Sequence, residues 1–253
     1  MAGFKTHITT SSVLGVGYAA AAVALYDVEP SAAILAGGLC SVSGMLPDLD
    51  SGPGVPMRES IGFAAAVVPM LMIHRLKHLH MTPEMMILTG GAIYLAIRFG
   101  LSKMLKKFTV HRGMFHSLPA ALIAAELAFL LCAHWEAPMT RHAAADALQN
   151  LPSEDLAMRF FNAGAVLLGF MSHLILDEIW SLDFKGGRLR FKSSFGTAIK
   201  FWGQCGWANI VTYACAAAMT LAVLQDPVWN GDESAPGQNL QHIATQAIKN
   251  VRK

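Results

Sequence analysis

Charged residues are scarce in this sequence. Only 14% of its 253 residues are Asp, Glu, Lys or Arg, whereas 54% are hydrophobic. Soluble domains carry about a quarter of their residues as charged side chains. These charges are too few to cover a globule, so lipid must cover part of the surface. The net charge of +2 is small and no basic run with interleaved aromatic residues is present, so we do not expect nucleic acid as a partner.

Cysteine is also scarce, and its positions exclude two kinds of site. None of the four cysteines forms a C-x-x-C pair, and all lie in or beside apolar runs. Neither a disulfide framework nor a zinc–thiolate site is indicated. We interpret all four as small core residues: Cys40, Cys132, Cys205 and Cys215.

Long apolar stretches are what the sequence has instead. They lie at 8–26, 32–47, 60–74, 84–101, 117–134, 162–177 and 207–225. A helix needs about 20 residues to cross a bilayer, and shorter stretches are often re-entrant. The sequence therefore predicts an all-α, polytopic transmembrane bundle of about five to seven spanning or re-entrant helices. We expect a membrane-embedded domain over 1–225 and a polar tail over 226–253.

The ends of the first three stretches are interpreted from local signals. The first stretch has no convincing signal-peptide cleavage site, so we interpret it as an uncleaved membrane helix. Pro47 is expected to end the second stretch, and Pro69 to kink the third, because proline cannot donate a helical hydrogen bond.

The distribution of Lys and Arg predicts the orientation, because cytoplasmic loops carry an excess of positive charge. With seven crossings and a cytoplasmic N-terminus, most of the 19 Lys and Arg residues fall in the inside segments 1–7, 48–59, 102–116 and 178–206. We therefore predict a cytoplasmic N-terminus.

Four short motifs offer imidazole or carboxylate groups, which suit zinc when thiolate is absent. In the orientation predicted from Lys and Arg alone, all four lie at the cytoplasmic ends of their helices. This coincidence predicts one shared metal site with the ligands His7, Asp48, Asp50, His111, His116, His173 and Asp177. Seven ligands exceed one tetrahedral shell, so we expect two or three zinc ions, with manganese or magnesium as alternatives.

The spacing of these ligands predicts how some of them meet. His173 and Asp177 are four residues apart and point to one face of a helix. Asp48 and Asp50 lie in a turn-like stretch, where an extended segment would send both carboxylates the same way.

Other polar residues fit the shared site less well. The histidines His74, His78 and His80 resemble a metal tract, but the same orientation places them on the opposite side of the membrane. We interpret them as interfacial residues. His111 and His116 are five residues apart and cannot share a helical face, so a break between them is expected. A further acidic residue, Glu126, lies within an apolar stretch and is expected to face the bundle interior.

In these motifs the chain resembles the YdjM-like family of bacterial inner-membrane, metal-dependent hydrolases. The resemblance covers about two-thirds of the chain, and its matching residues are Thr6-His7, the segment 47–51, His111-Arg112, His116-Ser117, His173 and Asp177. That family is distantly similar to the all-helical zinc phospholipase C and single-strand nuclease group. The resemblance implies a multi-pass protein of the bacterial inner membrane that cleaves phosphate esters. After Asp177 the sequence departs from the family pattern, in which a Thr or Tyr and a Gly follow.

The leading hypothesis is metal-assisted hydrolysis of an amphiphilic phosphate ester at the cytoplasmic membrane face. A bound metal lowers the pKa of a coordinated water from about 15.7 towards about 7. Glu178 is the candidate base or ligand support, while Arg112 and Lys192 either neutralise phosphate oxygens or anchor lipid headgroups. The expected partners are membrane lipid and this substrate, and no oligomeric state is predicted.

Two alternatives to an enzyme remain open at this point. A metal-binding transporter usually places its ligands near the bilayer midplane, which differs from ligands at helix ends. A membrane scaffold braced by zinc would have a closed site of four ligands, fewer than the seven candidates here.

Overall fold

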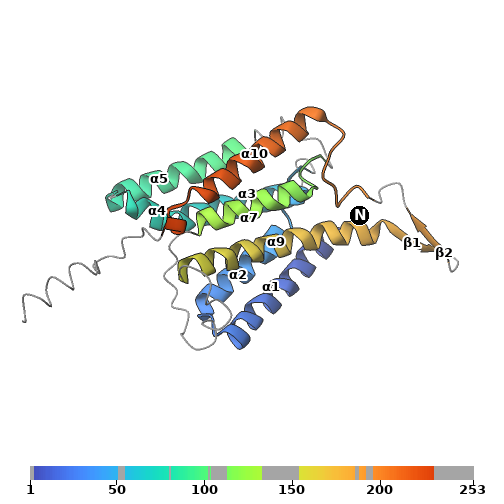
Figure 1. The fold of residues 1–253 in the computed structure, drawn as a ribbon, viewed down its shortest axis with the longest axis horizontal. Coiled ribbons are helices and arrows are strands. Elements are labelled where there is room, and N and C mark those ends of the chain that lie inside the picture. Colours follow the sequence, from blue (N-terminus) through green and yellow to red (C-terminus); the bar gives the residue numbers. More distant parts are fainter. Residues whose placement is uncertain are drawn as a thin grey trace, which may run out of the picture.

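The computed structural model describes residues 3–50, 55–79, 81–101, 103, 113–132, 154–185, 188–191 and 196–230. In these residues most elements are helices, and one short β-hairpin extends from an end of the bundle (Figure 1). The prediction of a helical bundle is confirmed for this part of the chain.

Three helices form the densely packed side of the bundle: α1 (Phe4–Tyr26), α2 (Pro30–Ser43) and α9 (Glu154–Trp180). The chain turns from α1 into α2 through Asp27, whose φ of 52° lies in the left-handed region. The Glu29 carboxylate then caps α2 by accepting hydrogen bonds from two backbone N–H groups of its first turn. α2 ends at Ser43, four residues before the predicted end at Pro47.

Glycine lets these three helices approach more closely than larger residues would allow. A Cβ atom at Gly37 of α2 would lie only 2.7 Å from the carbonyl oxygen of Gly15 in α1. A Cβ atom at Gly169 of α9 would overlap the backbone of Cys40 and the hydroxyl of Ser43. Small residues are the usual means of close helix packing in membranes, where the hydrophobic effect does not drive helices together.

A second group of helices packs beside the first. It consists of α3 (Val55–Leu71), α4 (Ile73–His78), α5 (Pro83–Leu95) and the π-helical turn η2 (Ala96–Leu101). Pro69 lies inside α3, two residues before the helix ends, and α4 starts two residues after that end. The helix is thus interrupted where proline was expected to kink it.

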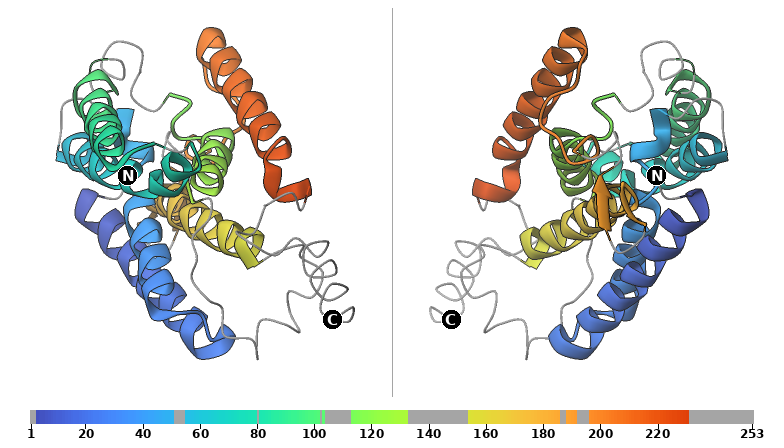
Figure 2. Two further views of the ribbon diagram at one scale, coloured as in Figure 1. Left: turned by 90° about the vertical axis from the view of Figure 1, so that its left-hand side faces the viewer. Right: turned by 90° about the vertical axis from the view of Figure 1, so that its right-hand side faces the viewer.

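The remaining helices continue the bundle on the other side of α9. α7 (Leu118–Leu131) contacts both α9 and α10 (Gly206–Leu224), and α1 and α2 lie across α9 from α10 (Figure 2). After α10 the chain forms a 3-10 turn, η3 (Pro227–Asn230).

A buried ion pair fastens the C-terminal end of α10 to the N-terminal part of α9. The guanidinium of Arg159 donates to the Asp226 carboxylate over 2.7 Å, and both residues are at most 5% exposed. The same guanidinium lies over the ring of Phe129 in α7, 5.6 Å from its centre. The first residues of the predicted tail therefore pack on the bundle.

The β-hairpin corrects the expectation of a wholly helical chain. β1 (Leu182–Lys185) pairs antiparallel with β2 (Arg188–Phe191) immediately after α9. The sequence alternates apolar and charged residues on both sides of a Gly-Gly pair, which is a strand pattern around a two-residue turn. This alternation is the sequence signal for the hairpin, and the expectation of an all-α chain did not include it.

Three of the described helical segments are long and apolar enough to cross a membrane: α1, Leu156–Trp180 of α9, and α10. α2 and α7 are apolar but shorter. The predicted total of five to seven crossings is therefore not established by the described part of the chain.

The glycine contact between α1 and α2 gives a direct test of the packing. Replacing Gly37 by Ala forces a methyl group against the Gly15 carbonyl, and such overpacking costs about 1–3 kcal/mol. The matched control is Gly38→Ala, because a Cβ atom there meets nothing within 4 Å. Thermal unfolding in detergent should show a lower midpoint for Gly37→Ala only. Equal midpoints for the two variants would contradict the packing.

Candidate metal centre

Five of the predicted ligands converge at one end of the bundle. His7 comes from the first turns of α1, and Asp48 from the 3-10 turn η1 (Pro47–Asp50) that follows α2. His116 lies in the loop before α7, and His173 and Asp177 project from the last two turns of α9. The start of α1 and the ends of α2 and α9 meet there (Figure 1).

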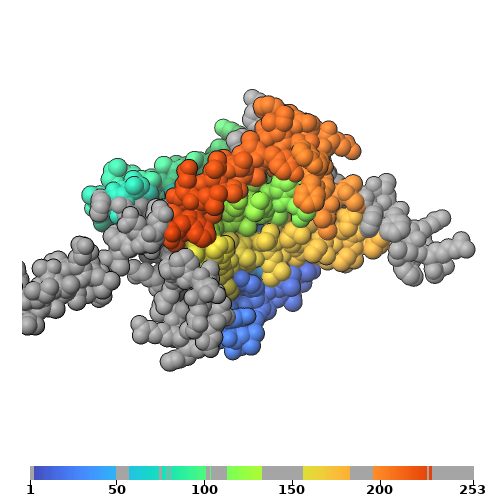
Figure 3. Space-filling model, in the orientation of Figure 1, coloured from blue at the N-terminus to red at the C-terminus, as the bar shows by residue number. Residues whose placement is uncertain are grey.

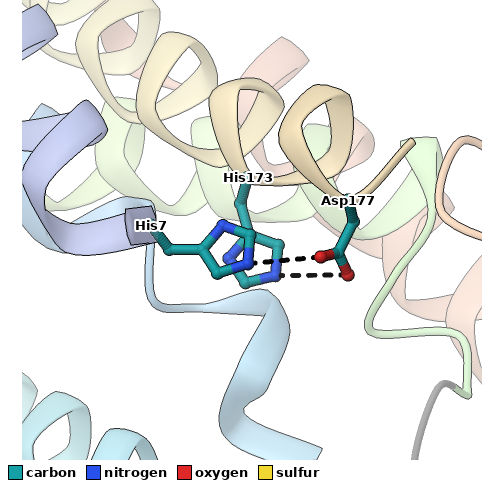
Figure 4. Close-up of side chains that lie close together, drawn as sticks. All are labelled: His7, His173 and Asp177. Atoms are coloured by element: carbon teal, nitrogen blue, oxygen red, sulfur yellow. Dashed lines mark ion pairs between the residues drawn. The ribbon is translucent and has the colours of Figure 1, made fainter. Parts of the chain in front are cut away.

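The ligand atoms form two groups that share His173. One group is His7, His173 and Asp177, and the other is Asp48, His116 and His173; within each group the ligand atoms lie within 4.8 Å of one another. Nε2 of His7 is 3.2 Å from one Asp177 oxygen, and Nε2 of His173 is 4.0 Å from the other (Figure 4). The His7 and His173 rings are stacked with their centres 3.6 Å apart.

Asp48 closes the second group. Its Oδ1 atom is 3.6 Å from Nε2 of His116 and 3.7 Å from Nε2 of His173. Metal–ligand bonds of about 2.1 Å put the ligand atoms of a tetrahedral ion about 3.4 Å apart. The separations between these side chains therefore suit atoms that share a metal ion.

The cluster is almost completely buried. His7, His116, His173 and Asp177 are at most 2% exposed, whereas the Asp48 side chain is 15% exposed. Burial acts to raise the pKa of the Asp48 carboxyl. The adjacent His116 and the other nearby histidines outweigh it and hold that pKa below its usual range. Asp48 is thus held as the anion a metal ligand must be.

A backbone carbonyl sets the tautomer of His173. Nδ1 of His173 lies 2.7 Å from the oxygen of Gly44, and a carbonyl can only accept, so Nδ1 carries the hydrogen. In the neutral ring Nε2 then has the lone pair, and it faces the carboxylates of Asp48 and Asp177. This nitrogen is buried with no hydrogen-bond partner among the described residues. Lone pairs facing one another repel unless a cation lies between them, so the residues fit a metal ion.

The position of that carbonyl follows from the helix packing. A Cβ atom at Gly44 would overlap the side chain of Ser11 in α1 and lie 3.4 Å from the carbonyl oxygen of Gly169 in α9. The Ser11 hydroxyl donates to the carbonyl of Ser41 over 2.7 Å, which joins α1 to α2 at this level. Gly44 was not found from the sequence, because a backbone carbonyl gives no sequence signal.

The expected geometry of the two aspartates is wrong. Asp48 and Asp50 lie in the 3-10 turn η1 and not in an extended segment. A 3-10 turn lacks the two-residue alternation of an extended segment, on which that expectation rested. Only the backbone of Asp50 is described. The predicted site residues His111, Arg112 and Lys192 lie outside the described residues.

Glu178 follows a ligand in sequence but belongs to neither group. Its carboxylate accepts a hydrogen bond from the N–H of Gly196, which has a φ of 78°. Its second oxygen is buried without a hydrogen-bond partner among the described residues. Glu178 therefore connects the end of α9 to the segment that leads into α10.

The alternative histidine tract lies on other helices. The backbone of His74 and His78 belongs to α4, which contacts α3 and α5. Their side chains, and His80 as a whole, lie outside the described residues. The interpretation of these histidines as interfacial remains a prediction.

Glu126 faces another helix, as expected. Its Oε1 atom accepts a hydrogen bond of 2.6 Å from the hydroxyl of Thr220 in α10. The sequence did not identify this partner because the pairing of α7 with α10 is a tertiary contact.

Metal analysis tests the cluster through its shared histidine. The purified protein should carry about two zinc equivalents, and His173→Ala should remove about one of them because the ion held by His173 loses a ligand. The matched control is Ser172→Ala, since the neighbouring Ser172 hydroxyl bonds the Gly169 carbonyl of its own helix and belongs to neither ligand group. Elemental analysis in detergent measures both. A wild-type protein that neither contains nor takes up zinc or manganese would disprove the site.

Comparison with known proteins places these residues in a family. A family model described as YdjM inner membrane protein matches residues 1–224, a range that contains every candidate metal ligand. No curated protein and no solved structure matches the chain. These comparisons give no similarity to the zinc phospholipase C and single-strand nuclease group. The extent of the match and the apolar helices lead to one conclusion: the chain belongs to the YdjM inner membrane protein family.

Proposed function

We propose that this protein is a metal-dependent membrane hydrolase that cleaves a phosphate ester of an amphiphilic substrate. The observation that carries this proposal is the pair of three-residue ligand groups sharing His173. Five ligands exceed the four that close a structural zinc site. Sites with two metals about 3.5–4 Å apart are common in enzymes that cleave phosphate esters.

The two oxygens of Asp177 suggest how the ligands divide between two ions. Oδ1 faces His7, whereas Oδ2 faces both His116 and His173 at 4.0 Å. Asp177 would therefore bridge, with His7 on one ion and Asp48, His116 and His173 on the other. His173 serves a single ion because its other nitrogen is bonded to Gly44. Asp50 and His111 are the further ligands predicted from the sequence, and zinc is the metal that this ligand set favours.

The proposed chemistry needs water, a phosphoryl group and groups that handle protons and charge. A bound metal ion supplies a coordinated water of lowered pKa and polarises the phosphoryl oxygen. The Glu178 carboxylate, oriented by the Gly196 N–H, is the proposed base or support for the neighbouring Asp177. Arg112 and Lys192 are the proposed contacts to phosphate oxygens.

The surroundings of the cluster favour a lipid-like substrate. The ligands lie at or beside the ends of apolar helices, which would put them next to the headgroup region if these helices cross a membrane. Asp48 is the most exposed of the five, so substrate would approach from its side. The Lys and Arg bias favours the cytoplasmic face of the inner membrane for this end of the bundle.

One observation favours a second candidate, a scaffold in which the metal only braces the helices. Four of the five ligands are buried, and together the five tie α1, η1, α9 and the loop before α7 to one point. A bracing metal would stabilise the fold without opening a position to substrate. Ligands at helix ends fit a transporter less well than either candidate.

Hydrolysis assays separate the enzyme from the brace. Zinc-loaded protein should cleave phospholipid or lipid-linked phosphate, and His116→Ala and Asp177→Asn should each lower the rate by about a hundredfold or more, since each 1.36 kcal/mol of lost stabilisation is tenfold. His80→Ala is the control and should stay within a few-fold of wild type. A protein that needs zinc for thermal stability but cleaves no lipid or nucleotide phosphate ester would support the brace.

Labelling from one side of the membrane tests the orientation. Lys5 lies at the end of α1 that carries the metal ligand His7, and Tyr26 lies at the opposite end; both are exposed. Each is replaced by Cys in turn. In a background without exposed cysteines, an impermeant maleimide applied to intact cells should label position 26 and spare position 5. The reverse pattern would put the metal cluster on the outer face.

A further inference from the structure

α10 presents an apolar face that no described part of the chain covers. Trp207, Ile210, Leu221 and Leu224 are each more than half exposed along its length. In the space-filling view α10 forms the orange-to-red side of the surface (Figure 3). Its 19 residues span about 28 Å, close to the roughly 30 Å of a hydrocarbon core. The length and the apolar character of this exposed face therefore fit contact with lipid.

Just before α10, exposed aromatic residues gather on a non-helical segment. Ile199, Phe201 and Trp202 are exposed there, with Phe201 at 60% and Trp202 at 67%; we call residues 199–205 the aromatic shelf. Irregular backbone cannot face lipid within the hydrocarbon region, because its N–H and C=O groups would lack partners. Tryptophan is enriched where the hydrocarbon meets the headgroups. Both facts put the aromatic shelf in the headgroup layer.

Specific bonds hold the aromatic shelf on α10. The Tyr213 hydroxyl donates to the carbonyl of Phe201 over 2.9 Å, and its ring lies 4.7 Å from the Trp202 ring. The Asn209 amide both accepts from and donates to the backbone of Gly203, at 2.8 and 3.0 Å. The exposed aromatic rings therefore have a fixed position relative to the membrane helix.

The aromatic shelf also contacts the loop that carries a metal ligand. The N–H of Leu118 donates to the carbonyl of Lys200 over 3.0 Å. Gly203 lies against Met114, since a Cβ atom there would come within 3.2 Å of the sulfur. These two contacts lie on either side of His116 in sequence. The position of the aromatic shelf along the membrane normal thus determines how deep His116 lies in the membrane.

We propose that the aromatic shelf is seated among phospholipid headgroups and holds the metal cluster at that depth in the membrane. The partner of this surface is the phospholipid interface itself. Another tryptophan lies at the other end of α10, where the opposite headgroup layer is expected. Trp229 follows α10, is 38% exposed, and donates its indole N–H to the carbonyl of Val223. This inference concerns position in the bilayer and does not depend on hydrolysis taking place.

Two native cysteines allow a depth measurement on the full chain. Cys205 lies within the aromatic shelf and Cys215 near the middle of α10, and both are exposed, whereas Cys40 and Cys132 are buried. Cys215→Ala leaves position 205 for a spin label, and Cys205→Ala leaves position 215. Each labelled protein is reconstituted in phosphatidylethanolamine–phosphatidylglycerol vesicles. Collision rates with oxygen, which concentrates in hydrocarbon, and with a water-soluble nickel chelate then report depth.

The expected result is a several-fold higher oxygen-to-nickel ratio at position 215 than at position 205. Position 205 should still be better shielded from nickel than a free label in water. Nickel access at 205 equal to that of the free label would overturn the proposal, as would equal depth at the two positions. Low access of both reagents at 215 with spin–spin broadening would also overturn it, since a second copy of the chain would then cover α10.

A double variant tests whether the aromatic rings set this depth. Phe201→Ser with Trp202→Ser should raise nickel access at position 205 by a few-fold, because both exposed rings are lost. Bound zinc should stay at the wild-type level, which shows that the bundle has folded. An unchanged nickel access with normal zinc content would contradict a role for the rings.

Discussion

The close contact between α2 and α9 is the constraint on which the metal cluster depends. Gly169 lets α9 lie against the last turn of α2, and His173 follows one turn later on the same face of α9. That spacing brings the His173 ring within 2.7 Å of the Gly44 carbonyl, which fixes the lone pair on Nε2. Any residue larger than glycine at 169 would separate the two helices. The geometry of the cluster therefore depends on the absence of a side chain at position 169.

The ligands of the cluster are both gathered at helix ends and buried, and the two properties together favour metal binding. Two carboxylates and three imidazoles are gathered where little water reaches them, so a bound cation would supply the charge that solvent otherwise provides. Ligands that must be deprotonated couple metal binding to pH and to folding. Because the ligands come from segments as distant in sequence as His7 and Asp177, a bound ion would join elements that are far apart along the chain.

Some of this could be predicted from sequence, and the reason differs for each part. Helical periodicity places His173 and Asp177 on one face, and the charge bias brings the motifs to one end. The local conformation around Asp48 could not be predicted correctly. The segment is a 3-10 turn and not extended, and four residues are too few for hydrophobic periodicity to distinguish these two conformations. Contacts made by backbone atoms, such as the Gly44 carbonyl, leave no trace in side-chain chemistry.

The ion pair between Arg159 and Asp226 has a consequence for how the protein is made. The two residues are 67 positions apart, and both are buried at the end of the bundle away from the metal cluster. The ribosome makes Arg159 well before Asp226, so this ion pair can form only after α10 has been synthesised. A chain truncated after α9 therefore lacks the contact that joins the end of α10 to α9.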